Sequence, residues 1–230
     1  MKVMKFGGTS VGKPERMQDV AKLIIKNEEP VIVVLSALSG TTNALIEIGN
    51  AIASGDRENA KRLIAVLEKN YQDFIQQLLS KPEALAKAKE IVAEHFEFLN
   101  IILKISFSEA LSKDILAQGE LLSTRLFSTY LNDQSIDHLL LPALEFMIID
   151  GNDEPQIGSI KVKLTQLLKQ HKDKKIFITQ GYICRNARGE VDNLKRGGSD
   201  YSASLIAAAI NASVCEIWTD IDGMHNNDPR

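Results

Sequence analysis

The sequence is poor in the features that mark secreted and membrane proteins. Only two of its 230 residues are cysteines, Cys184 and Cys215, and because they lack CxxC spacing we interpret them as reduced thiols. The longest apolar runs, such as Pro30–Leu35, are far shorter than the roughly 20 residues of a membrane-spanning helix. No apolar stretch of about 7–15 residues follows the basic N-terminus, which excludes a secretory signal. Together these absences predict a cytoplasmic protein with no membrane partner.

Neither sign of charge dominates the chain. Lys and Arg number 27 and Asp and Glu number 30, giving a formal charge of −3 with no basic run. This balance argues against nucleic acid as a partner. The four histidines are scattered, so we expect no metal site built from protein ligands. An apolar content of 44% is ordinary for a globular protein, and the length predicts one large domain over residues 1–230.

Short apolar runs alternate with helical periodicity, which is the pattern of an α/β protein. The predicted strands are Lys2–Phe6, Val31–Leu35, His138–Leu141, Ile176–Thr179 and Val214–Trp218. Such strands form a mostly parallel central sheet covered by helices on both faces, a three-layer αβα sandwich. Ligands of open α/β sheets bind beyond the carboxyl ends of the strands, so the loops that follow the strands are the candidate binding loops.

Two apolar stripes with helical spacing predict a helical hairpin, inserted between sheet elements at about residues 57–105. One stripe runs from Leu63 to Leu78 and the other from Leu85 to Leu103. Stripes of this kind usually pack in a core, and we assign them no chemistry. His95 falls on the second stripe, and we interpret it as a core histidine with its polar atoms satisfied.

The first candidate loop is the segment 5–10, KFGGTS, at the end of the first predicted strand. Gly7 and Gly8 allow the backbone to approach a ligand closely, and their N–H groups suit an anion. Lys5 adds a compact cation that suits phosphate. Most glycine pairs are only tight turns, and the spacings of the P-loop and of the Rossmann fingerprint are both absent.

The second candidate loop, Ser36–Asn43, carries five hydroxyl or amide side chains in eight residues. These donors suit an anionic or zwitterionic small molecule. A helix N-cap is the simpler explanation for any one of them, but it needs only one.

The third candidate loop, Arg196–Ser202, contains another glycine pair and precedes an alanine-rich helix. Ser199 has the chemistry to cap this helix, and Asp200 falls in its first turn, where the helix dipole favours an ionised carboxylate. Arg196 is placed to bind a carboxylate with its forked guanidinium group.

Glu120 lies at the edge of a broad apolar helix face formed by Leu111, Leu116, Leu122 and Phe127. A carboxylate at that position favours a bound cation, such as the ammonium group of a substrate, over simple solvation. A surface glutamate is the alternative explanation.

Five motifs occur in the order found in aspartate kinases, and the sequence resembles that branch of the amino-acid kinase family over its whole length. The motifs are KFGGTS (5–10), VVLSALSGTTN (33–43), GELLSTRL (119–126), RGGSDYSA (196–203) and WTDIDG (218–223), followed by DPR (228–230). KFGGTS and GGSDYSA separate the sequence from the carbamate, glutamate, acetylglutamate and uridylate kinases of the family. The N-terminal segment and SVCEIWTD lean towards the bifunctional aspartokinase–homoserine dehydrogenases.

The resemblance implies transfer of the γ-phosphoryl group of ATP to the side-chain carboxylate of L-aspartate. The product would be 4-phospho-L-aspartate, the first intermediate towards lysine, threonine and methionine. The substrate carboxylate attacks directly, so the enzyme needs positioning and charge neutralisation rather than a nucleophile of its own. Mg²⁺ is expected to arrive with ATP, held mainly by phosphate oxygens and water.

The resemblance also implies roles for individual residues. The catalytic residues would be Lys5 and Asp200; the aspartate-binding residues would be Ser36, Thr42, Glu120, Arg196 and Ser199. The ATP-binding residues would be Lys5, Gly7, Gly8, Thr219, Asp220, His225 and Arg230. The family often has an aromatic residue near the position of His225.

The chain ends directly after a loop, at Asp228–Arg230, which predicts a fragment of a longer protein. Aspartate kinases continue there with more of the nucleotide lobe and then with regulatory domains or a fused dehydrogenase. Family members usually form homo-oligomers through the regulatory part, so the resemblance implies an oligomer for the full-length protein and is compatible with a monomer for this chain.

Two other functions stay open from the sequence. One is a non-catalytic module that binds an amino acid, if the nucleotide site is incomplete. The other is a related kinase with a different acceptor, such as another amino acid or a carbamate. Glu120 and Arg196 argue against this second alternative, because together they would hold an ammonium group and a carboxylate, the marks of an amino acid.

Overall fold

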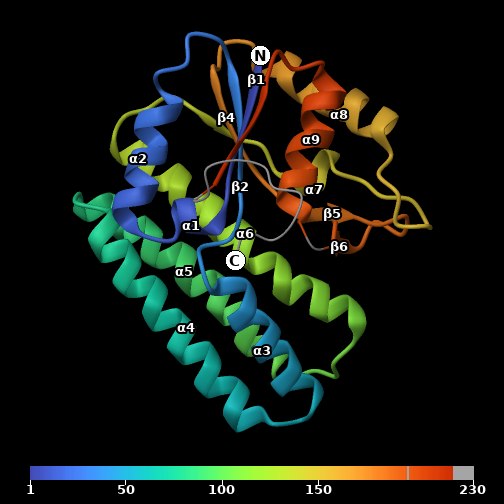
Figure 1. Cartoon of the computed structure of the whole chain (residues 1–230). Helices are drawn as coiled ribbons and strands as arrows, with labels where there is room; N and C mark the ends of the chain where they lie inside the picture. The colour runs from blue at the N-terminus through green and yellow to red at the C-terminus, as the bar shows by residue number, and fades with distance from the viewer. Residues whose placement is uncertain (196, 220–230) are drawn as a thin grey trace.

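A computed structural model describes residues 1–195 and 197–219 of the chain (Figure 1). The strands are β1 (Lys2–Phe6), β2 (Val31–Leu35), β3 (Leu139–Leu140), β4 (Ile176–Gln180), β5 (Ile183–Arg185), β6 (Val191–Asn193) and β7 (Cys215–Trp218). The helices are α1 (Gly8–Val11), α2 (Pro14–Ile24), α3 (Thr41–Ala53), α4 (Arg57–Leu78), α5 (Pro82–Ile102), α6 (Glu109–Asp133), α7 (Ala143–Phe146), α8 (Ile157–Gln170) and α9 (Gly198–Ile210).

Five strands form a central sheet in the order β3-β4-β2-β1-β7, and every pairing in this sheet is parallel. The predicted mostly parallel sheet with helices on both faces is therefore confirmed. All five expected strands are present, although β3 is only two residues long. The chain moves from β1 to β2 on one side and returns to β7 on the other, the kind of reversal beside which ligands bind in open α/β sheets.

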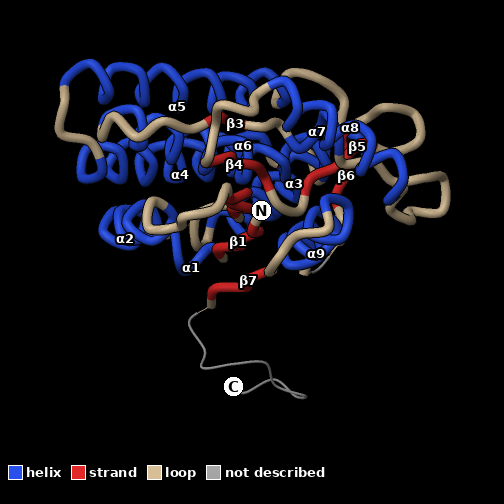
Figure 2. The backbone as a smooth tube through the Cα atoms, turned by 90° about the horizontal axis from the view of Figure 1, so that it is seen from above, coloured by secondary structure: helices blue, strands red, loops and turns tan. Residues whose placement is uncertain are grey.

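Side chains alternate between two cores, one on each face of the sheet. In β2, Val31, Val33 and Leu35 pack with α2 to α6, while Ile32 and Val34 pack with α7, α8 and α9. Figure 1 shows α2 on one side of the sheet and α8 and α9 on the other, and Figure 2 shows the same layers from above. The apolar run of β2 is continuous because both of its faces are buried.

The alternation of side chains along β1 also determines which helix Lys5 faces. Met4 and Phe6 of β1 belong to the core that includes α2, whereas Val3 belongs to the core that includes α9. Lys5 is two residues after Val3 and therefore shares its side of the sheet. The strand thus delivers the Lys5 ammonium group towards the start of α9.

Helices α4 and α5 occupy the region in which the apolar stripes indicate two helices, and they extend past the carboxyl ends of the strands in Figure 1. His95 of α5 is buried, and its Nδ1 lies 2.6 Å from Oε1 of Gln118. Its Nε2 lies 3.0 Å from Nη1 of Arg125. Burial lowers the pKa of His95, and both ring nitrogens have partners, which confirms its interpretation as a satisfied core histidine.

Strands β5 and β6 form an antiparallel hairpin beside the main sheet. The turn of this hairpin lies between Arg185 and Val191. Cys184 and Cys215 are both free thiols, as predicted. In the described part of the chain, none of the helices combines the length and apolar character needed to cross a bilayer.

Candidate active site

Four neighbouring strands end at the same level, and their ends define one edge of the sheet. Phe6 of β1 is in register with Leu35 of β2 and with Trp218 of β7, and Leu35 is in register with Gln180 of β4. The loops that begin after these residues therefore start side by side. This shared edge explains how loops far apart in the sequence, such as those after β1, β2 and β4, reach one site.

A cavity of about 580 Å³ opens at this edge. The residues that line it are Lys5, Ser36, Thr42, Asn43, Ile46, Glu120, Tyr182, Lys195, Gly197, Gly198, Ser199 and Asp200. It contains each described residue that was predicted to be catalytic or to bind aspartate. The structure thus brings together residues from β1, the loop after β2, α6 and the start of α9.

Lys5 and Asp200 form an ion pair at the N-terminus of α9. The distance from Nζ of Lys5 to Oδ1 of Asp200 is 2.7 Å. Asp200 lies in the first turn of α9, as the sequence predicts, where the positive end of the helix dipole stabilises its negative charge. The lysine is therefore held in place by a carboxylate that is itself half exposed to solvent.

Glu120 is almost completely buried, with 4% of the residue exposed. Its Oε1 accepts a hydrogen bond from the backbone N–H of Ala37 at 3.3 Å, whereas Oε2 has no hydrogen-bond partner. Burial raises the pKa of Glu120 to about 7, although the Ala37 bond acts in the opposite direction. A buried carboxylate with one unpaired oxygen in the wall of a cavity is suited to bind a cationic ligand.

The loop after β2 approaches both α6 and α1 closely, and one glycine on each helix permits this. A Cβ atom on Gly119 would lie 2.8 Å from Cβ of Ala37, and one on Gly8 would lie 2.9 Å from the Ala37 carbonyl oxygen. Both distances are shorter than real contacts allow, so side chains at these positions would force the segments apart. Gly119 thus lets Ala37 reach Glu120, and Gly8 leaves room for the same loop beside α1.

Ser36 and Thr42 lie on either side of this close approach, and both line the cavity. Helix α3 begins at Thr41 after Gly40, whose φ of 82° places it in the left-handed region, and no side chain caps the helix. The hydroxyl groups of the loop are therefore not used for capping, the simpler explanation for any one of them.

The start of α9 differs from the prediction in one respect. Ser199 was expected to cap the helix, but α9 begins at Gly198, and its N-cap is Gly197 with a φ of 76° and no side-chain cap. Ser199 lies instead inside the first turn and lines the cavity. Because the helix already starts after the left-handed Gly197, Ser199 has a helical backbone and not the extended backbone of an N-cap residue.

Gly7 is the N-cap residue of α1 and lies close to the ammonium group of Lys5. A Cβ atom at Gly7 would lie 3.2 Å from Nζ of Lys5, so the absence of a side chain leaves room at the ammonium group. Gly7 and Gly8 border the cavity residues but do not line the cavity themselves.

Four predicted residues, Arg196, Asp220, His225 and Arg230, lie outside the described residues. Thr219 is described and directly follows β7, whose Trp218 ring stacks on Phe6 with a centroid distance of 5.8 Å. Thr219 does not line the cavity.

Three cavity residues lie outside the candidate loops and were not predicted: Ile46, Tyr182 and Lys195. Tyr182 and Lys195 both have left-handed backbones, with φ of 64° and 63°. Non-glycine residues in this region store strain, which is often found at functional sites. Burial raises the pKa of Tyr182 to about 12. The one sequence signal that indicates a site role for Tyr182 is its position just after a strand, two residues beyond the end of β4.

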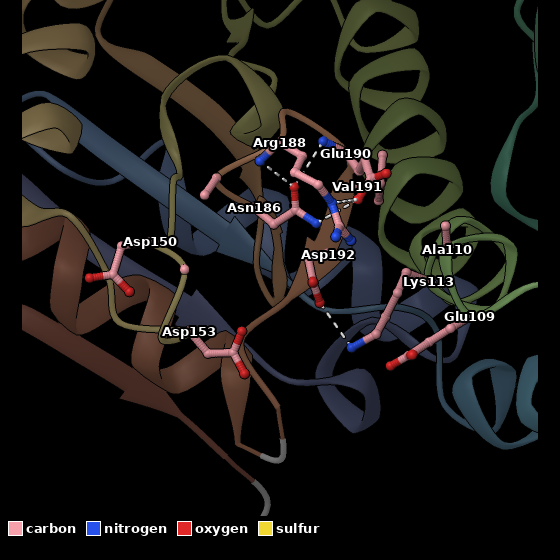
Figure 3. Close-up of a pocket in the computed structure, with 12 residues that line it drawn as sticks. Glu109, Ala110, Lys113, Asp150, Asp153, Asn186, Arg188, Glu190, Val191 and Asp192 are labelled. Atoms are coloured by element: carbon pink, nitrogen blue, oxygen red, sulfur yellow. Dashed lines mark hydrogen bonds and ion pairs between the residues drawn. The ribbon is translucent and has the colours of Figure 1, made fainter.

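A second, separate cavity of about 290 Å³ lies between the start of α6, the loop around 150–153 and the β5–β6 hairpin (Figure 3). Its charged groups largely pair with one another: Lys113 Nζ lies 2.9 Å from Asp192 Oδ1, and Arg188 Nε lies 2.8 Å from Glu190 Oε2. It contains none of the predicted site residues. Across the described ranges, no group of three or more His, Cys, Asp or Glu side chains is arranged to hold a metal ion.

Comparison with known proteins agrees with this fold. The chain belongs to the amino acid kinase family, whose sequence profile matches residues 1–230. Within that family, the match is to the catalytic domain of the aspartokinases.

Two curated relatives come from Escherichia coli. Lysine-sensitive aspartokinase 3 is 32% identical over 231 residues, covering 99% of this chain and 51% of that protein. Bifunctional aspartokinase/homoserine dehydrogenase 2 is 34% identical over 229 residues, covering 98% of this chain and 28% of that protein. The chain thus spans about half the length of the first relative and less of the second.

Two crystal structures of Escherichia coli aspartokinase III are also similar to the chain. The complex with lysine and aspartate has a TM-score of 0.84 and 29% identity. The complex with aspartate and ADP has a TM-score of 0.83 and 30% identity. Each match covers the whole of this chain and 51% of the chain in the crystal.

Proposed function

We propose that this chain carries the catalytic centre of an aspartate kinase, which transfers the γ-phosphoryl group of ATP to the side-chain carboxylate of L-aspartate. One observation carries the proposal: the Lys5–Asp200 ion pair and the buried, half-unpaired Glu120 carboxylate line the same cavity. The first group suits a phosphate, and the second suits an ammonium group. Family membership and relatives solved with aspartate and ADP support the same assignment.

Three residues would hold the amino-acid end of the substrate. Glu120 would accept hydrogen bonds from the α-ammonium group through its unpaired Oε2. Arg196 and Ser199 would bind the α-carboxylate, and the short distance between their positions in the sequence suits a single small group. Ser36 and Thr42 line the same cavity and would contact the rest of the molecule.

Lys5 would act at the other end, on the phosphoryl group in transfer. An oxygen of the aspartate side-chain carboxylate attacks the γ-phosphorus, the bond from that phosphorus to the bridging oxygen breaks, and ADP leaves. The attacking oxygen is already ionised, so no proton has to be removed. The Lys5 ammonium group would stabilise the charge on the equatorial oxygens, and Asp200 would keep it oriented through the 2.7 Å ion pair.

The nucleotide would bind beside Gly7 and Gly8, and the resemblance to the aspartate kinases adds Thr219, Asp220, His225 and Arg230 as further contacts of the nucleotide. Near Lys5, the described residues offer the lone carboxylate of Asp200 rather than a cage of ligands, which fits a Mg²⁺ ion held mainly by the phosphates. When bound, that ion supplies positive charge to the phosphate oxygens.

Trapping of the product with hydroxylamine tests the proposal. The chain is incubated with Mg-ATP and L-aspartate, and the acyl phosphate is captured as its hydroxamate. Hydroxamate formation that is lost in Lys5→Ala and in Asp200→Ala supports a kinase. Saturable aspartate binding without transfer supports an amino-acid-binding module instead. The place of this reaction at the start of lysine, threonine and methionine synthesis is part of the same proposal and depends on the product being 4-phospho-L-aspartate.

A further inference from the structure

The carboxylate of Glu120 is fixed by few contacts of its own. One oxygen accepts a 3.3 Å hydrogen bond from the Ala37 N–H, and the other has no partner. The place of this carboxylate in the cavity wall therefore depends mainly on where the α6 backbone lies at Glu120. Residues that hold that turn of α6 control the geometry of the proposed ammonium site.

Two hydroxyl groups bind the backbone carbonyl of Glu120. Oγ1 of Thr124 donates to it at 2.8 Å, and Oγ of Ser123 donates to it at 3.2 Å. The one hydroxyl hydrogen of Ser123 is shared with the carbonyl of Ser36, 2.8 Å from the same Oγ, and this contact joins the turn to the loop after β2. Ser123 and Thr124 are fully buried, so water does not compete for these bonds.

Gln180, the last residue of β4, connects the same turn to the sheet. Its Nε2 donates to Oγ1 of Thr124 at 2.7 Å, and its Oε1 accepts from the backbone N–H of Ala143 at 2.8 Å. Only 2% of Gln180 is exposed. A buried relay thus runs from the carboxyl end of β4 through Thr124 to the carbonyl of Glu120.

We propose that Thr124 and Gln180 are positioning residues, which hold the Glu120 turn of α6 against the carboxyl end of β4 so that the Glu120 carboxylate stays in the cavity wall. The proposal deepens the proposed function and rests on it. Neither residue lines the cavity, and both are buried. Contact with substrate or with solvent therefore does not explain the polar side chains at these two positions. A purely structural role would predict lost stability without a specific loss of ligand binding.

Helix α6 offers a matched control for this distinction. Thr129 is also buried, and its Oγ1 donates to the carbonyl of Arg125 four residues earlier at 2.9 Å, as Thr124 does to Glu120. Thr129 has no bond to Gln180. Thr124→Val and Thr129→Val therefore remove the same kind of bond from the same helix, and Thr124→Ser restores the hydroxyl.

Calorimetric titration of the full chain with L-aspartate gives the first readout, with thermal unfolding measured in parallel. We expect Thr124→Val to raise the Kd for aspartate about tenfold, as the displacement of one charged hydrogen bond implies. Thr129→Val and Thr124→Ser should bind as the wild type does. Equal Kd values in the two valine variants would overturn the proposal, while a wild type that does not bind aspartate would instead overturn the proposed function.

A second readout needs no substrate. NMR titration of the ¹³C-labelled Glu120 carboxyl group should show a pKa nearer the ordinary glutamate value in Thr124→Val, because a displaced turn admits water, and no change in Thr129→Val. Gln180→Met interrupts the relay from its other end and covers the case in which Thr124→Val does not fold. An unchanged Glu120 titration in a folded Gln180→Met chain would also overturn the proposal.

Discussion

Nζ of Lys5 lies 2.7 Å from Oδ1 of Asp200, so an ion pair joins the first strand of the sheet to the first turn of α9. The two side chains differ in exposure, at 11% for Lys5 and 55% for Asp200. The cation is largely withdrawn from water, while its partner faces the open side of the cavity. An incoming phosphate can therefore approach the lysine without displacing a buried carboxylate.

Replacement of Lys5 by Met should lower the rate of phosphoryl transfer by about 100- to 1,000-fold, since it removes a charge aimed at the transferred group. Lys2→Met is the matched control. Lys2 lies on the same strand and pairs with Glu216 at 2.9 Å, away from the cavity. The hydroxamate assay measures both rates. A similar loss of rate in the two variants would show that Lys5 has no special role in phosphoryl transfer.

Aspartate affinity should increase with pH between about 6 and 8. Burial raises the pKa of Glu120 to about 7, and the ionised form is the one that binds an ammonium group. Kd should fall about tenfold over this range, following the ionised fraction. Tyr182, with its pKa raised to about 12, does not titrate there. Calorimetry at several pH values measures the trend, and Glu120→Gln should bind weakly at every pH. A wild-type Kd that is flat with pH would contradict the assignment of Glu120.

The same group should make the ligand-free chain less stable as pH rises. The folded-state pKa of Glu120, about 7, is above its ordinary value of 4.5, so the folded state holds the proton more tightly. The stability from this group is complete below about pH 4.5 and is lost as pH rises through 7, on the order of 3 kcal/mol in all. Urea unfolding of wild type and Glu120→Gln across this range tests the sign. The gap between the two curves should widen with pH, in favour of Gln, and parallel curves would count against it.

Gly119→Ala should destabilise the chain and weaken aspartate binding. The new Cβ would meet Cβ of Ala37 at 2.8 Å and Cγ2 of Thr41 at 3.3 Å, which pushes α6 away from the loop that carries Ser36. Gly49→Ala, within α3, is the control, because a Cβ there meets no atom within 4 Å. It should stabilise the chain by about 0.5–1 kcal/mol through helix propensity. Thermal unfolding and calorimetry distinguish them, and two variants of equal stability would show that the close approach is not required.

Much of this arrangement could be predicted because local pattern and tertiary structure agree. The apolar runs at Lys2–Phe6 and Val31–Leu35 match β1 and β2 residue for residue, since buried parallel strands leave an unbroken apolar signal. The burial of Glu120 was also foreseeable, as it lies at the edge of an apolar helix face. Most of the other candidates were expected at one edge of the sheet, because their loops follow the carboxyl ends of predicted parallel strands.

The errors and omissions have physical causes that no local pattern carries. Ser199 does not cap α9, because the left-handed Gly197 is the N-cap and the helix starts two residues earlier than a Ser199 cap requires. Tyr182 and Lys195 reach the cavity through left-handed backbones, which are held by tertiary contacts rather than by the preferences of Tyr or Lys. The relay of Thr124 and Gln180 joins residues 56 positions apart, and neither shows its partner in the sequence.

The pairing of β1 with β7 has a consequence for the synthesis of the chain. About 200 residues separate the two strands, and at the usual 5–20 residues per second the ribosome takes roughly 10 to 40 seconds to add them. During that time one edge of β1 has no strand to pair with, and open apolar edges are templates for wrong pairing. Nascent chains should therefore pass through a period of dependence on chaperones, which ends when β7 emerges and pairs with the open edge of β1.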